Sequence, residues 1–527
     1  MKKQTSAPLP RSPRRGRVVR SGDMAVFVSN ADLSDSEIKK NEDRALRQSI
    51  IDEQGEPVFY KMHEGNPTSI AQVKAPFFVT LYSKQNDLVW EEEQKRFYEY
   101  QQSTGLWRKV EEPSIVSSVH RFMLKESRSD ELAKGMPTMN LEALLTLKFE
   151  EEIIKRLKGN VAVKGEFDRK EGFATGERYI HFMNGVKVIE DGKLVDGLHP
   201  FDKRFFSTGR IPLNYDPDAD CPRFRAWLQE CLDPAEADAD TDAILIYIGM
   251  CLVGFNMFQK ILLLHGQSGS GKSSMSLMVQ MLIGDGNCAE FNTSTVDKNP
   301  FAMSAFVNVW LLYTADVASN FLLKPGAAML KKLTGGDKMQ AQFKFGGFAT
   351  ITGTLNTILT MNTRSPTVRL DDDVDAWRRR FIVIPFLNTP SNDSEEFSRF
   401  LIKEEGSGIV NQALQALFAA RESGRRFPMS KAQLMRVDEM LGRSDTVGEF
   451  LLDRVEIEKG EELIKSSLVR EYMDYCKVRH WAVGGHNEIG GKLKALMQEK
   501  FGVAESNSIE DHRGKCVQGY RGVRLKD

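Results

Sequence analysis

The segment from Gly266 to Ser274 has the residue types and the spacing needed to hold a chain of phosphates. Four residues separate Gly266 from Gly271, and Lys272 and Ser273 follow directly, which is the phosphate-binding loop pattern G-x-x-x-x-G-K-S. Glycines let backbone N–H groups converge on phosphate oxygens, and a helix start adds free donors and a favourable dipole. We expect Lys272 to reach the β- and γ-phosphates of a nucleoside triphosphate and the Ser273 hydroxyl to hold Mg²⁺. The residues expected to line this loop are Gly266, Gln267, Ser268, Gly269, Ser270, Gly271, Lys272, Ser273 and Ser274.

The sequence on each side of this loop predicts the elements that position it. An apolar run at 261–264 predicts a strand, and an amphipathic pattern at 275–283 predicts a helix. From about 236 to 390 strand-like and helix-like segments alternate, which favours a parallel sheet with helices on both faces. The expected strands are 261–265, 309–314, 357–361 and 381–386. Ligands of such sheets gather at the carboxyl ends of the strands.

Three further groups could complete a hydrolytic site. Asp316 ends the second expected strand, where an acid that helps to hold Mg²⁺ belongs, and Asn362 ends the third, where an amide could orient water. Arg378 and Arg379 precede the last strand and could supply positive charge to a neighbouring subunit's site. Each has a simpler interpretation: an acid that merely ends a strand, an asparagine in a turn, and a solvated arginine edge.

A hairpin is expected between these strands. Met339, Ala341, Phe343 and Phe345 alternate with polar residues, as in a half-buried strand, and Gly346-Gly347 allows a reversal into 348–351. Lys338 and Lys344 lie at the ends of the first strand, so the hairpin could contact a phosphate backbone. An ordinary surface hairpin explains the same residues equally well.

The order of these motifs resembles the superfamily III helicases, and most closely their phage/plasmid and poxvirus-type primase–helicase group. The resemblance also covers Asn184-Gly-Val186 to Cys221-Pro222 and the ending Gly519 to Lys526, so it spans about residues 90–527. It implies an AAA+-type P-loop ATPase motor that assembles as a hexameric ring around DNA and moves 3′ to 5′ with ATP and Mg²⁺. Carried over by position, Asn362 is the sensor, Arg378 or Arg379 acts in trans, and Lys338 and Lys344 lie in the channel hairpin.

The chain departs from the family pattern at two positions. Asp316 stands where the family usually has Glu, and no second acid adjoins it, so Glu290 or another acid could share its task. Gln342 stands in the hairpin where many relatives have Arg. No pair of acids lies in a plausible primase sheet, so we expect priming to be left to a separate primase.

Composition limits the remaining predictions. The 527 residues carry 72 Lys and Arg against 73 Asp and Glu, so any nucleic-acid surface must be local. We expect a disordered basic tail at 1–24, an α+β region at 25–220, the α/β motor at 221–440 and a winged helix at 441–527. From 447 onward we expect three helices and then two strands, at about 515–518 and 522–526. Six scattered cysteines and the lack of a membrane-length apolar run favour a reduced, cytoplasmic setting without membrane partners.

The combined evidence favours an ATP-dependent, ring-forming replicative DNA helicase of a phage, plasmid or other mobile element. Two alternatives stay open. One is an origin-binding initiator in which ATP governs only assembly and DNA melting. The other is a P-loop ATPase that does not unwind DNA.

Overall fold

The structure is a computed structural model that describes most of the chain. The described residues are 17–21, 24–28, 34–133, 146–167, 178–190, 192–292, 296, 299, 301–317, 321–323, 325–344, 348–362, 374–424, 426–444, 446–478, 485–510 and 513–526. The chain divides into two compact units: Met1–Trp90 with Arg96–Tyr100 and Lys109–Val163, and Glu91–Lys95 with Gln101–Arg108 and Lys164–Asp527. None of the helices in the described ranges is long and apolar enough to cross a membrane.

Helices with an aromatic-rich core dominate the first unit. Phe77, Phe78 and Leu81 are at most 1% exposed in this core. The first helix begins at a capping box in which Ser34 and Glu37 satisfy each other's backbone N–H groups. The elements are α1 (Asp35–Gln54), β3 (Val58–His63), β4 (Asn66–Val73), α2 (Ala75–Gln85), β5 (Leu88–Glu91), β6 (Arg96–Gln101), β7 (Leu106–Val110), α3 (Glu112–Ala133), α4 (Leu147–Asn160) and β8 (Ala162–Val163). Strands β3 and β4 form a hairpin, and the other four form a sheet of order β7-β6-β5-β8.

Part of the predicted disordered tail forms a strand. Strand β1 (Arg17–Ser21) pairs antiparallel with β2 (Met24–Val28), whereas residues 1–16 lie outside the described residues. The described residues of the predicted tail are therefore largely strand. The physical reason is that valines on both segments favour a pleated strand.

Residues 164–220, expected ahead of the motor, are grouped with the motor. The region contains β9 (Arg178–His181), β10 (Val186–Glu190) and β11 (Lys193–Leu194). Ile180, Phe182 and Ile211 are buried in the same hydrophobic cluster as the helices of the motor. Their side chains therefore extend the motor core beyond the expected boundary at residue 221.

The motor is built on a five-stranded parallel sheet of order β13-β14-β17-β12-β18. The strand before the phosphate-binding loop lies between β17 and β18, to which it is hydrogen-bonded. All four predicted strands form, with edges shifted by two residues at most. The strands are β12 (Ile261–Gly266), β13 (Cys288–Glu290), β14 (Leu311–Thr314), β17 (Asn356–Met361) and β18 (Phe381–Phe386). This confirms the mixed α/β fold with a parallel sheet.

Helices cover both faces of this sheet. Leu262 and Leu264 of β12 face the core cluster that holds α7, α8 and α12, whereas Ile261 and Leu263 face a second cluster that holds α10 and α13. This alternation is the two-residue period of a strand buried on both sides. The helices are α6 (Pro222–Cys231), α7 (Ala237–Val253), α8 (Lys272–Ile283), α10 (Pro325–Gly335), α11 (Val374–Arg378), α12 (Glu395–Ser423) and α13 (Lys431–Ser444).

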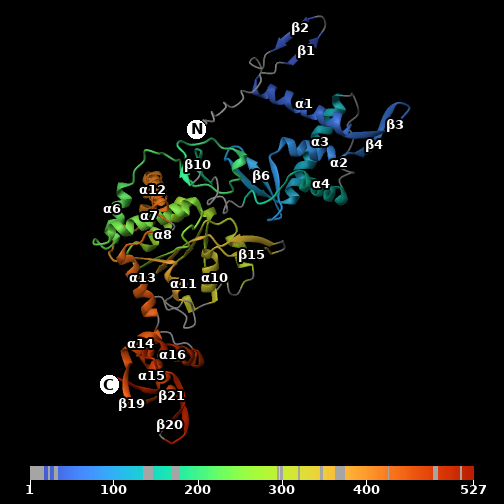
Figure 1. Ribbon diagram of the computed structural model, residues 1–527. Coiled ribbons are helices and arrows are strands. Elements are labelled where there is room, and N and C mark those ends of the chain that lie inside the picture. Colours follow the sequence, from blue (N-terminus) through green and yellow to red (C-terminus); the bar gives the residue numbers. More distant parts are fainter. Residues whose placement is uncertain are drawn as a thin grey trace, which may run out of the picture. The chain divides into compact units, whose positions relative to one another are not determined.

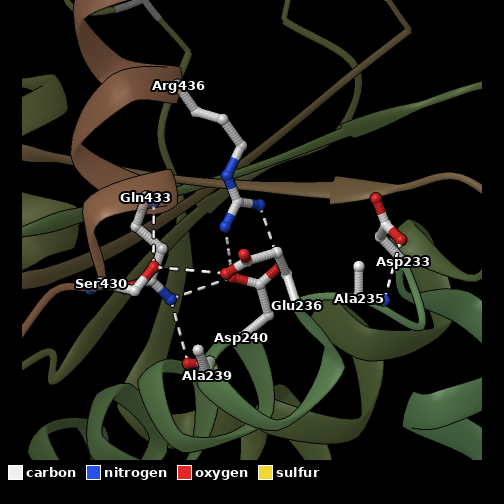
Figure 2. Close-up of polar contacts among 8 residues, drawn as sticks. All are labelled: Asp233, Ala235, Glu236, Ala239, Asp240, Ser430, Gln433 and Arg436. Carbon is white, nitrogen blue, oxygen red and sulfur yellow. Dashed lines mark hydrogen bonds and ion pairs between the residues drawn. The ribbon is translucent and has the colours of Figure 1, made fainter.

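A buried polar network fastens α13 to the start of α7 (Figure 2). Asp240 is completely buried, and Arg436 donates to both of its carboxylate oxygens at 2.6 and 2.9 Å. The Gln433 amide donates to Asp240 Oδ1 at 2.9 Å and to the Ala239 carbonyl oxygen at 3.0 Å. Ser430 caps α13, because its hydroxyl accepts from the Gln433 N–H at 3.1 Å. The network therefore fixes both the start and the orientation of α13.

The C-terminal residues have a hydrophobic core of their own. Its elements are α14 (Thr446–Arg454), β19 (Val455–Ile464), α15 (Lys465–Val478), α16 (His486–Phe501), β20 (Glu505–Glu510) and β21 (Cys516–Leu525), with sheet order β19-β21-β20. The sequence predicted two strands near the end, but these residues form the single strand β21. Gly519 does not break it: a Cβ there would lie 2.4 Å from the Leu463 carbonyl oxygen, so glycine permits close strand pairing.

Candidate nucleotide-binding site

The phosphate-binding loop lies between the carboxyl end of β12 and the start of α8. Gly269 and Gly271 have φ angles of 74° and 89°, in the left-handed region, and Gly271 is the N-cap of α8. A Cβ at Gly266 would lie 2.0 Å from the Phe386 carbonyl oxygen of β18. The three glycines are therefore needed for the path of the loop, which leaves the first N–H groups of α8 without helical partners.

Lys272 points into the loop that precedes it. Its ammonium donates to the Gln267 carbonyl oxygen at 2.5 Å and lies 3.2 Å from Ser270 Oγ. Burial lowers the pKa of this ammonium, and the Asp316 carboxylate opposes part of that shift. The lysine charge and the Asp316 charge are thus within electrostatic reach of each other.

The serines at the start of α8 differ in their surroundings. Ser273 is exposed at the mouth of the loop. The Ser274 hydroxyl instead donates to the Asp393 carbonyl oxygen at 2.8 Å. Gln267, Ser268 and Gly269 are exposed along the loop. Ser273 is therefore the serine hydroxyl placed to bind a ligand in the loop.

Asp316 and Asn362 meet beyond the ends of neighbouring strands. The Asn362 amide donates to Asp316 Oδ1 at 3.0 Å, and both side chains are exposed. Thr360 holds the Asp316 backbone, because its hydroxyl accepts from the Asp316 N–H at 3.0 Å. Asp316 itself has a φ of 50°, a strained conformation for a residue with a side chain. Sequence reasoning missed Thr360, although a threonine in an apolar strand was a usable signal.

Glu290, the acid that could share the task of Asp316, lies one strand further towards the edge of the sheet. Glu290 ends the edge strand β13, and its register partner on β14 is Tyr313. Asp316, by contrast, follows β14 directly and is held by Asn362 and Thr360. The structure therefore brings Asp316, and not Glu290, together with Asn362.

The two arginines before β18 have different environments. Arg378 donates to Asp438 of α13 at 2.8 Å and also pairs with Asp375. Arg379 is exposed, and its guanidinium makes no ion pair with any part of the chain that the structure describes. The next residue, Arg380, is buried and donates to the Ala376 carbonyl oxygen at 2.9 Å. Of the two predicted residues, Arg379 is the one left accessible.

The predicted hairpin forms from β15 (Lys338–Gln342) and β16 (Phe348–Thr352), and it extends away from the parallel sheet (Figure 1). Ala341 is buried and Met339 and Phe343 are half-buried, whereas Gln340, Gln342, Lys338 and Lys344 are exposed. The predicted alternation is therefore present. Phe345, the last residue of that pattern, lies outside the described residues.

Residues 391–393, which follow β18, form a strap that supports the phosphate-binding loop. The sequence analysis did not predict this strap. Ser391 N–H donates to Glu230 Oε2 at 2.7 Å, and the Trp227 indole N–H donates to the Asn392 carbonyl oxygen at 2.8 Å. Trp227 also lies against the loop, because a Cβ at Gly271 would be 3.0 Å from its ring. No local sequence signal predicts this strap, since its partners are more than 160 residues apart in the chain.

Metal-ligating side chains are sparse around this site. Among the described residues, no group of three or more His, Cys, Asp and Glu side chains is arranged to hold a metal ion. A cation at Ser273 and Asp316 would therefore take most of its ligands from phosphate and water, as Mg²⁺ does in nucleotide sites. The residues present fit that chemistry and do not fit an all-protein metal cage.

Comparisons with known proteins agree with this architecture. Residues 75–233 match the family model described as D5 N terminal like, and residues 264–380 match one described as a family of unknown function, DUF5906. The first match begins in the first compact unit and ends just after α6 of the motor, and the second lies within the motor. The match to the D5 N terminal like model supports the resemblance to viral and phage primase–helicases of superfamily III that the motifs indicated. No curated protein matches this chain.

Two solved structures are similar over long stretches but only weakly. The apo structure of the NrS-1 C terminal region (305-718) has 13% identity and a TM-score of 0.44, and covers 85% of this chain and 99% of that chain. A JCV Helicase structure with a bound small molecule has 17% identity and a TM-score of 0.24, and covers 42% of this chain and 59% of that chain. At such scores these likenesses add nothing to the argument.

Proposed function

We propose that this chain is an ATP-dependent DNA helicase that works as a homo-oligomeric ring, a hexamer by its family, and moves 3′ to 5′ during replication of a phage, plasmid or other mobile element. One observation carries the proposal. The phosphate-binding loop and the accessible arginine lie at opposite ends of the same sheet, so a complete site needs two subunits.

The strand register supports this separation. Ile261 of β12 pairs with Phe381 of β18, and Gly266 pairs with Phe386. Arg379 lies just before Phe381, whereas the loop begins at Gly266, so about six residues, or about 20 Å of strand, separate them. That distance exceeds the reach of an arginine side chain. Arg379 can therefore serve only the loop of a neighbouring subunit.

Within one subunit, the loop residues have distinct roles in the proposed site. Lys272 binds the β- and γ-phosphates of ATP. Its partly desolvated ammonium is stabilised when anionic phosphate oxygens replace the neutral oxygens of the loop as its partners. Ser273 and Asp316 hold Mg²⁺, which when bound neutralises phosphate charge. Asn362 fixes the shorter carboxylate of Asp316 and orients the attacking water. The neighbour's Arg379 then offsets charge at the γ-phosphate.

Arg378 has a different role from Arg379 in this proposal. Its bonds to Asp375 and Asp438 hold α11 against α13. Arg378 therefore positions the segment, and Arg379 acts on the neighbouring site. Exposed ion pairs are individually weak, but a guanidinium between two carboxylates has little freedom to reach elsewhere.

DNA is proposed to bind at two places. Lys338 and Lys344 on the hairpin take phosphates of a single strand in the ring channel, which predicts binding that falls with salt and ignores sequence. The order helix, strand, helix, helix, strand, strand in the C-terminal residues supports the proposal that they form a winged helix. They serve fork duplex or partner proteins, and priming is left to a separate primase.

Strand displacement tests the proposal. Forked DNA substrates of both polarities are incubated with ATP and Mg²⁺, and release of the labelled strand is followed. Lys272→Ala should abolish release while leaving assembly largely intact, and Arg399→Ala, which breaks an exposed ion pair with Glu395 on α12, should retain activity. A wild-type protein that displaces no strand from either fork overturns the helicase assignment. DNA-stimulated ATP turnover without displacement identifies a motor that does not unwind.

A further inference from the structure

The outer face of the hairpin carries an exposed aromatic ring among polar side chains. Phe348, the first residue of β16, is 53% exposed. It pairs in register with Gln342 on β15, so its ring lies on the same face as the exposed residues Gln340, Gln342 and Lys338. A large apolar side chain in that position is not explained by the packing of the protein.

The opposite face of the hairpin is packed against the motor core, so the face that carries Phe348 cannot turn inward. Ala341 and Ile351, on the opposite face, are buried in the second motor core cluster. At the base, Gly336 N–H donates to the Gly353 carbonyl oxygen at 2.7 Å, and Gly353 N–H donates to the Asp337 carbonyl oxygen at 2.8 Å. A Cβ at Gly353 would lie 1.8 Å from the Lys332 carbonyl oxygen, so α10 is packed directly against this base.

The surroundings of Phe348 favour a planar, polar-edged ligand over a protein surface. Among the described residues of the hairpin, Phe348 is the only large hydrophobic side chain that is exposed. Protein-docking surfaces are contiguous apolar patches, whereas a lone ring beside lysines and amides is what a stacked base with its phosphates requires. Bases in a duplex are already stacked on each other, so only an unpaired base can offer its face.

We infer that Phe348 stacks on an unpaired base of the strand that the hairpin lysines hold by its phosphates. This inference rests on the proposed function and adds a second mode of contact to it. The lysines supply attraction that depends on salt, and Phe348 supplies contact that depends on the presence of a base. The hairpin thereby distinguishes single-stranded from duplex nucleic acid without reading sequence.

Binding of a normal oligonucleotide and of one with abasic sites tests the inference. Both single strands are titrated with the full-length protein at several salt concentrations, and fluorescence anisotropy reports the Kd. The wild type should bind the abasic strand about thirtyfold more weakly, the middle of the range for stacking one base on an aromatic side chain. Phe348→Ala should bind both strands equally, at the level of the wild type on the abasic strand.

Matched variants separate stacking from other effects. Phe348→Trp should restore the preference for the normal strand, and Phe348→Leu, which is apolar without a ring, should not. Lys344→Ala should weaken binding to both strands alike and reduce the salt slope by about 0.7, the value for one phosphate of a single strand. Leu434→Ala, at a side chain that is 52% exposed on α13, controls for removal of an exposed apolar group.

The outcomes distinguish failure of the stacking role of Phe348 from failure of the proposed function. Equal binding of normal and abasic strands by the wild type overturns the stacking role while leaving DNA binding in place. A Phe348→Ala variant that keeps the full preference for the normal strand overturns it as well. If the wild type binds neither strand, the proposed function itself fails.

Discussion

The buried ion pair between Asp240 and Arg436 should be the most costly contact to break in the motor. Asp240 is 0% exposed and Arg436 donates to both of its oxygens, so Arg436→Ala leaves a buried carboxylate without its charged partner. Removing one partner of a buried pair costs about 3–5 kcal/mol. The Gln433 amide stays at 2.9 Å, and Asp240 lies in the first turn of α7, where the helix dipole favours an anion. We therefore expect Arg436→Ala to lower the free energy of unfolding by about 3 kcal/mol, the lower end of that range.

Chemical unfolding of the full chain measures this loss, and two variants interpret it. The double variant Asp240→Asn with Arg436→Met has no buried charge, so it should recover to within about 1 kcal/mol of the wild type. Arg399→Ala, which breaks an exposed pair with Glu395 on α12, should cost about 0.5 kcal/mol or less. The reasoning is refuted if the double variant is as unstable as Arg436→Ala, because the loss would then come from packing and not from an uncompensated charge.

Two further variants test the two ends of strand β12. Lys260 precedes the strand; burial lowers the pKa of its ammonium from 10.5 to about 8, and the ammonium donates to the Met429 sulfur at 3.4 Å. Between these pKa values the unfolded chain keeps a proton that the folded chain releases, so wild-type stability rises from pH 8 to 10.5. Lys260→Met should raise stability by up to about 3 kcal/mol at pH 7, and thermal melting should show that gain fading at pH 10; an equal gain at both contradicts the explanation. Gly266→Ala places a methyl group 2.0 Å from the Phe386 carbonyl oxygen, so binding of a fluorescent ATP analogue should be lost; unchanged binding would show that β18 can move aside.

The parts of the site that follow from local chemistry could be predicted. Glycine spacing with the flanking apolar run predicted the loop, and the ends of expected strands predicted the meeting of Asp316 with Asn362. Both signals are local or depend on one rule, that parallel strands end on the same edge. The alternation in the hairpin likewise predicted its buried face, although not that Phe348 would join the polar one.

Long-range partners could not be predicted. The choice between Arg378 and Arg379 depends on Asp438, which is 60 residues away along the chain. The network under α13 joins residues 196 apart, and the acid it buries looks in the sequence like one more charge at a helix start. Strand β19 was missed for a related reason: its middle is charged and exposed, and only pairing with β21 makes it a strand.

Mixing two inactive variants tests the shared site most directly. Lys272→Ala subunits keep Arg379 but lose the phosphate ligand, and Arg379→Ala subunits do the reverse. In a ring that contains both variants, a site is complete where the intact loop of one variant meets the intact arginine of the other. Random mixing produces this arrangement at about a quarter of the interfaces. We predict that ATP turnover, negligible in each variant alone, returns on mixing to about a quarter of the wild-type rate. A mixture that stays as inactive as its components, or an Arg379→Ala protein that hydrolyses ATP at the full rate, would contradict the account.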